Sequence, residues 1–163
     1  MAIPERIHRN IDNRYWNPGV EYFPVKNRYT AGVAGQRFFE ELKDNGKLYG
    51  TECSKCNVTF VPARLFCERC FARLDEWVDV GLEGILYSFT VVHKTKSGDD
   101  KENPSLVGAV RIADGLLMHH LGDCEESELY IGMPVKAKLK PVSKREGKIT
   151  DIAYFKPLQM KQG

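Results

Sequence analysis

The chain of 163 residues lacks any apolar run near the 18 residues that a membrane-spanning helix requires. Its first ten residues, MAIPERIHRN, lack the apolar stretch of a secretory signal, so we expect a cytoplasmic protein. The net charge is also small, since 24 Lys and Arg oppose 22 Asp and Glu, and this balance weighs against nucleic acid as a partner. In the reducing cytoplasm, the five cysteines are expected to be metal ligands or free thiols rather than disulfides.

Familiar catalytic motifs are missing as well. The sequence contains no G-x-S-x-G, Walker A or G-x-G-x-x-G pattern, and it offers no evident set of nucleophile, base and oxyanion donors. His119 and His120 are adjacent on a predicted strand and therefore point to opposite faces, although either could pair with His93 as a base. Cys124 lies between two acidic residues, which disfavour its thiolate. We therefore predict no catalytic residue in this chain.

Four of the five cysteines form a regular pattern. Cys53 and Cys56 are separated by two residues, as are Cys67 and Cys70, and ten residues connect the two pairs. Two intervening residues allow each pair to turn both sulfurs toward one point about 2.3 Å away. Soft thiolates select zinc or iron, and four of them fill a tetrahedral shell without leaving room for water. The spacing predicts a structural metal, Zn²⁺ first, with iron as the rival.

A metal would also explain how so short a segment folds. Residues 47–73 cannot bury enough apolar surface to be stable alone. Metal binding supplies on the order of 10 kcal/mol in zinc-finger peptides. We expect Leu65, Phe66 and Phe71 to pack around the two cysteine pairs.

The remaining chain divides by its hydrophobic pattern. Residues 1–29 hold three prolines and five aromatics, which suggests an N-terminal arm that covers either its own domain or a partner. Residues 30–46 have apolar residues at helical spacing, with Thr30 as a candidate N-cap and Gly46 just past the end. The apolar stripe of this helix comprises Val33, Phe38, Phe39 and Leu42.

Residues 74–158 are dominated by β-branched and aromatic residues. We predict a strand from Trp77 to Val80, then strands at 84–95, 105–113, 115–122, 135–142 and 148–157, with a polar loop at 97–104. Asp114-Gly115 is a hairpin signal. Five or six short strands favour a small Greek-key barrel of the OB type, followed by a tail at 159–163. The predicted fold is thus mainly β with an N-terminal helix, a rubredoxin-like zinc ribbon and an OB-fold barrel.

This layout resembles a family of bacterial and archaeal proteins in which a rubredoxin-like zinc ribbon is fused to an OB fold. The likeness covers about residues 33–157 and is carried by three motifs. They are the helix with Phe38-Phe39-Glu40-Glu41-Leu42 and Gly46-Lys47-Leu48, the segment Phe60-Val61-Pro62-Ala63-Arg64, and the two cysteine pairs. The resemblance implies an acyl-CoA-associated accessory subunit that docks on a thiolase-type catalytic chain as a hetero-oligomer and helps to hold CoA. The arm resembles that of small subunits of benzoylsuccinyl-CoA thiolases, which act in toluene degradation.

The alternative is an OB module that binds single-stranded nucleic acid. Tyr87 and Phe89 alternate on one predicted strand and could stack bases. The near-neutral charge and the acidic segment 123–128 weigh against this alternative.

Overall fold

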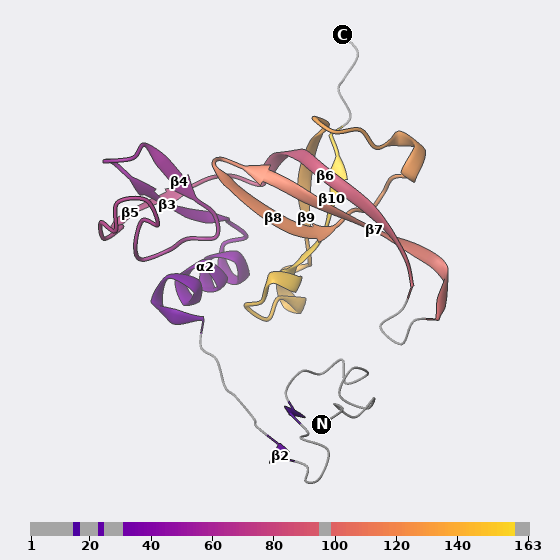
Figure 1. Ribbon diagram of the computed structural model, residues 1–163, viewed down its shortest axis with the longest axis horizontal. Coiled ribbons are helices and arrows are strands. Elements are labelled where there is room, and N and C mark those ends of the chain that lie inside the picture. The colour runs from indigo at the N-terminus through magenta and orange to yellow at the C-terminus, as the bar shows by residue number, and fades with distance from the viewer. Residues whose placement is uncertain (1–14, 17–22, 25–30, 95–98, 159–163) are drawn as a thin grey trace, which may run out of the picture.

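The computed structural model describes residues 15–16, 23–24, 31–94 and 99–158. Most of the predicted arm at 1–29 and the whole tail at 159–163 lie outside the described residues. Helix α2 leads into a three-stranded sheet of order β4-β3-β5, and a five-stranded sheet of order β10-β9-β6-β7-β8 follows (Figure 1). The predicted fold class, mainly β with a helix ahead of a zinc ribbon and an OB-type domain, is confirmed.

Helix α2 spans Gly32–Asp44, and its apolar side faces the rest of the molecule. Phe38 and Leu42 are fully buried, whereas Val33, which we expected in the same stripe, is 69% exposed. The predicted cap Thr30 lies outside the described residues. Gly46 has a φ of +65°, the left-handed conformation that glycine adopts readily at a helix C-terminus.

The ribbon sheet consists of β3 (Tyr49–Cys53), β4 (Val58–Phe60) and β5 (Glu76–Asp79). Strand β3 is central and pairs with both neighbours in antiparallel register. We predict that the OB-type domain begins at residue 74, and β5, just after that boundary, hydrogen-bonds to β3 of the ribbon. The segment after the second cysteine pair therefore returns to the ribbon before the chain enters the OB-type domain.

The OB-type domain, called the barrel below, is a single open sheet of five antiparallel strands, of which β6 and β7 are the longest. The five strands are β6 (Glu83–Lys94), β7 (Asp100–Ile112), β8 (Gly115–His120), β9 (Pro134–Leu139) and β10 (Ile152–Pro157). Strand β7 begins at Asp100, so much of the predicted polar loop at 97–104 is in fact strand. It pairs there with β6, which continues to Lys94. A parallel bridge between Leu121 and Phe155 brings the β8 end toward β10, and the Gly122 N–H donates to the Phe155 carbonyl at 2.9 Å.

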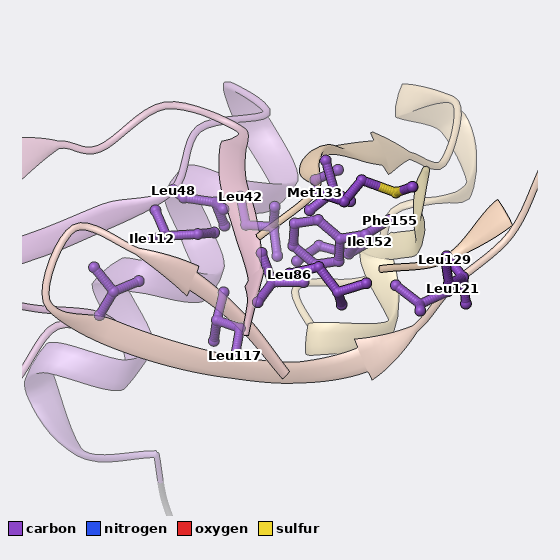
Figure 2. Close-up of a cluster of buried hydrophobic side chains, with 14 of the residues drawn as sticks. Leu42, Leu48, Leu86, Ile112, Leu117, Leu121, Leu129, Met133, Ile152 and Phe155 are labelled. Carbon is purple, nitrogen blue, oxygen red and sulfur yellow. The ribbon is translucent and has the colours of Figure 1, made fainter. Parts of the chain in front are cut away.

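One hydrophobic core joins the helix, the ribbon and the barrel (Figure 2). Its buried members are Phe38, Leu42, Leu48, Val61, Leu86, Val110, Ile112, Leu117, Leu121, Leu129, Met133, Val135, Ala137, Ile152 and Phe155. Since α2 and the ribbon contribute the first four of these residues, burial of apolar surface holds the ribbon and the barrel together. No helix in the described ranges is long and apolar enough to cross a membrane.

The β7–β8 hairpin docks directly on the ribbon. Asp114 at its tip accepts a hydrogen bond from the Thr59 backbone N–H of β4, with 2.9 Å between the nitrogen and Oδ2. Beside it, Gly115 lies so close to Val61 that a Cβ on Gly115 would collide with the Val61 carbonyl oxygen. The Asp-Gly pair predicted as a turn signal therefore also forms one of the contacts between the ribbon and the barrel.

A buried carboxylate organises the segment between β9 and β10. Asp151 is fully buried, and its two oxygens accept backbone N–H groups from Glu146, Gly147 and Lys148 at 2.7–3.2 Å. Burial acts to raise the pKa of the Asp151 carboxyl, but these three donors outweigh it and lower that pKa. The adjacent Arg145 donates from Nη1 to the Lys43 carbonyl near the end of α2, at 3.3 Å.

Candidate metal centre

Two tight turns present the four cysteines. Cys53 ends β3, and its carbonyl accepts hydrogen bonds from the N–H groups of Cys56 at 3.2 Å and Asn57 at 2.7 Å. In the loop between β4 and β5, the Cys67 carbonyl accepts the Phe71 N–H at 2.9 Å. We call these turns the first knuckle (53–57) and the second knuckle (67–71).

The sulfur geometry fits a tetrahedral metal site. All four Sγ atoms lie within 4.8 Å of one another. Cys53 Sγ and Cys70 Sγ are 3.6 Å apart, and Cys56 Sγ and Cys67 Sγ are 3.8 Å apart. Disulfide sulfurs would lie about 2.05 Å apart, whereas thiolates about 2.3 Å from one ion at tetrahedral angles lie about 3.8 Å apart. This donor set can therefore hold a metal ion.

The surroundings of the four cysteines shift the pKa values of Cys67 and Cys56. Cys67 is fully buried, which by itself raises its pKa, but the N–H groups of Cys70 and Arg69 and the neighbouring thiol of Cys53 bring that pKa to about 7. The Arg69 N–H lies 3.4 Å from the Cys67 sulfur. Hydrogen bonding to Cys70, followed by desolvation, raises the pKa of Cys56 to about 12, and repulsion from the Cys53 thiolate adds a smaller part. A bound divalent cation would remove that repulsion and favour four thiolates.

The aromatic residues of the ribbon are arranged differently from our expectation. Phe66 is 57% exposed and Phe71 is 81% exposed. The small core around the cysteines is instead built from Val58, Phe60 and Leu74, with Cys53 and Cys67. The prediction that Phe66 and Phe71 pack around the knuckles is wrong, because the turns direct both rings toward solvent.

Three of the four other candidate residues line one cavity of the OB-type domain. His93, His120 and Cys124 line one cavity of about 560 Å³, with Glu125 and Tyr154 in the same wall. His119 instead packs against the Phe155 ring, and desolvation lowers its pKa. The thiol of Cys124 has a raised pKa, first because it is partly buried and then because carboxylates surround it. The cavity thus holds a thiol that resists ionisation.

Two lysines of β9, Lys136 and Lys138, are engaged in ion pairs. Lys136 contacts Glu83 at 3.0 Å, and Lys138 contacts Asp123 at 3.4 Å and the Tyr154 hydroxyl at 2.5 Å. These pairs are solvent-exposed and contribute little to stability.

Only one of the two aromatic residues proposed to stack on bases is exposed to solvent. Tyr87 is 54% exposed, but Phe89 packs against the barrel core. A register shift between Leu86 and Ser88 interrupts the alternation of side chains at Tyr87, so the two residues differ in burial. This arrangement weighs further against the nucleic-acid alternative.

Comparison with known proteins identifies the family of this chain. Residues 41–76 match the rubredoxin-like zinc ribbon domain of ChsH2, and residues 77–140 match its C-terminal OB-fold domain. The chain belongs to this ChsH2-type family of zinc ribbons followed by OB folds, which is also termed DUF35. The resemblance to a zinc-ribbon and OB-fold family is confirmed.

Individual relatives agree with this family. A "DUF35 domain-containing scaffold protein" of Methanocaldococcus jannaschii is 26% identical over 127 residues, which are 76% of this chain and 90% of the relative. A crystal structure of a DUF35 protein of unknown function from Sulfolobus solfataricus has a TM-score of 0.56 and 28% identity, over 77% of this chain and 86% of that one. A chain of the "Ltp2-ChsH2(DUF35) aldolase" has a TM-score of 0.55 and 25% identity, over 83% and 98%.

Proposed function

We propose that Cys53, Cys56, Cys67 and Cys70 hold one structural Zn²⁺. The spacing of their sulfurs is the observation that supports it. The ion would supply folding energy rather than chemistry, because four thiolates leave no coordination position for a substrate. Elemental analysis of the purified chain tests this assignment: one zinc per chain is expected, and a red, iron-containing protein would correct the metal.

We further propose that the chain is a non-catalytic accessory subunit of a thiolase-type acyltransferase complex in the cytoplasm. The support is the family itself, since one relative is termed a scaffold protein and another is part of an aldolase that also contains Ltp2. The candidate metal centre has no open position, and the thiol of Cys124 resists ionisation. The catalytic nucleophile and base would therefore belong to the partner chain.

The substrate class that we propose is acyl-CoA, held at or near the interface between the two chains. Within this class, we propose benzoylsuccinyl-CoA thiolysis in toluene degradation, because residues 1–29 resemble the arm of small subunits of benzoylsuccinyl-CoA thiolases. Aromatic residues and arginines, both present in this segment, are enriched at protein interfaces.

Two measurements test this function. The tagged full chain, purified from the cells that produce it, should bring down a thiolase-type chain in fixed stoichiometry. The isolated chain should neither cleave nor condense acyl-CoA esters, and activity should require the co-purified partner. Turnover by the pure chain would contradict the proposal, and strongly salt-dependent binding of single-stranded oligonucleotides would favour the nucleic-acid alternative instead.

A further inference from the structure

The two knuckles share a backbone conformation but differ in one side chain. The residue that follows the second cysteine is left-handed in both, with φ of +52° at Asn57 and +57° at Phe71. Each donates its N–H to the carbonyl of the first cysteine in its knuckle. Asparagine adopts this conformation comparatively easily, whereas a bulky residue such as phenylalanine does so at a cost. The second knuckle therefore carries a side chain that its backbone disfavours.

The fold gains little from that side chain. The Phe71 ring is 81% exposed, and the ribbon core does not include it. Phe66 is 57% exposed and lies on the same loop, where its backbone bridges to Arg73. Residues in costly conformations cluster at functional sites, and solvent-exposed aromatics become energetically important when a partner buries them. The two rings therefore suit a contact outside this chain.

The segment that carries these rings is mainly positive in its sequence. Residues 53–74 contain four cations, Lys55, Arg64, Arg69 and Arg73, against one carboxylate, Glu68. Glu68 pairs with Arg64, and Asp75 pairs with Arg73. In the part of the chain that the structure describes, Lys55 and Arg69 are exposed and have no ion-pair partner.

We propose that Lys55, Phe66, Arg69 and Phe71, the knuckle patch, form the docking surface for the thiolase-type catalytic chain. That chain would receive the rings in an apolar pocket rimmed by carboxylates, which complement the two unpaired cations. This inference rests on the proposed function. A second copy of this chain suits the patch poorly, because a two-fold contact would place cations against cations. A small ligand also suits it poorly, since such sites enclose most of the ligand surface.

Glycine substitution in each knuckle distinguishes the effect of the Phe71 ring from the effect of the left-handed backbone. Phe71→Gly removes the ring and relieves the left-handed conformation, whereas Asn57→Gly relieves the equivalent conformation without touching the patch. The full chain and the co-purified thiolase-type chain are mixed, and Kd is measured by calorimetry or biolayer interferometry. We expect Phe71→Gly to raise Kd at least tenfold while metal content and Tm stay at or above wild type. Asn57→Gly should change Kd less than twofold.

Two further variants test the chemistry of the patch. Phe66→Ser should also raise Kd at least tenfold. The double variant Lys55→Gln with Arg69→Gln should weaken the dependence of Kd on salt, because its two cations no longer meet carboxylates.

Several results would overturn this assignment. If wild type binds the thiolase-type chain and both Phe66→Ser and Phe71→Gly bind it within twofold of wild type, the patch is not the docking surface, although the proposed function stands. If wild type binds no such chain, the proposed function and this inference both fail. A lower Tm in Phe71→Gly than in Asn57→Gly would mean that the ring serves the fold. Self-association of wild type that Phe71→Gly abolishes would assign the patch to a second copy.

Discussion

Gly115 at the start of β8 lies against Val61 of the ribbon, and a Cβ on Gly115 would come within 2.8 Å of the Val61 backbone nitrogen. The clash is with backbone atoms, which cannot rotate away as a flexible side chain can. Any larger residue at 115 must therefore push the β7–β8 hairpin off the ribbon.

Gly115→Ala is accordingly expected to destabilise the protein by roughly 1–3 kcal/mol, the usual cost of overpacking. Urea unfolding measures this loss, and amide exchange at Thr59, whose N–H donates to Asp114, should become faster. The control is Gly35→Ala within α2, where the new Cβ would lie 3.0 Å from the Cβ of the exposed Ala31 rather than against the backbone of another segment. The roughly 0.5–1 kcal/mol by which a helix favours alanine over glycine offsets that contact, so we expect little change in stability. Equal stability of the two variants would contradict the close contact.

Cys67→Ala should lose the bound metal and unfold the ribbon. If a structural zinc contributes about 10 kcal/mol, loss of even a quarter of that energy is easily measured by thermal unfolding. Cys124→Ala serves as the control, because this thiol lies far from the other four sulfurs in the sequence and lines a separate cavity. It should retain metal and nearly all stability. Full metal content in Cys67→Ala would refute the assigned ligand set.

Asp151→Asn is expected to cost about 2 kcal/mol at pH 7, because hydrogen bonds to a charged acceptor are each worth about 1.5–3 kcal/mol. The pKa of this carboxyl is lowered in the folded protein, so its contribution is present above the unfolded pKa of about 3.9 and is lost as pH falls through the lower folded value. Wild type should therefore lose stability in acid below about pH 4 more steeply than Asp151→Asn. Unfolding free energies measured between pH 2 and 7 provide the comparison. If the unfolding free energies of the two proteins fall equally steeply in acid, Asp151 is not the group that causes the loss of stability.

Deletion of residues 1–29 should weaken assembly with the thiolase-type chain and leave the metal content intact. The reason is compositional, since this segment holds five aromatics and four arginines. Size-exclusion chromatography of the mixed chains, together with elemental analysis, checks both parts. An unchanged affinity and full activity of the complex would mean that this segment is not a docking element.

The sequence predicted those features that depend on local chemistry. The cysteine spacing anticipated the clustered sulfurs, apolar periodicity anticipated α2, and Asp114-Gly115 anticipated the hairpin. The missed features depend on contacts between distant segments. The sequence near Glu76 and Asp79 does not indicate that β5 pairs with β3 rather than with the barrel. An alternating pattern predicts a strand, but it does not specify which other strand it pairs with.

The exposure of Phe71 could have been anticipated in part. The residue after each C-x-x-C pair takes a left-handed φ, and Asn57 is a residue type that often does so. Alignment of the two knuckles would have placed Phe71 at the same position, and hence outside the ribbon core.

The hydrogen bond between Thr59 and Asp114 spans 55 residues of sequence. A ribosome adds about 5–20 residues per second, so several seconds separate the synthesis of these two partners. All four ribbon cysteines are made before the hairpin on which the ribbon will rest. If the four cysteines hold the proposed Zn²⁺, the order of synthesis lets the newly made ribbon bind the ion first, and the OB-type domain then assembles against the folded ribbon.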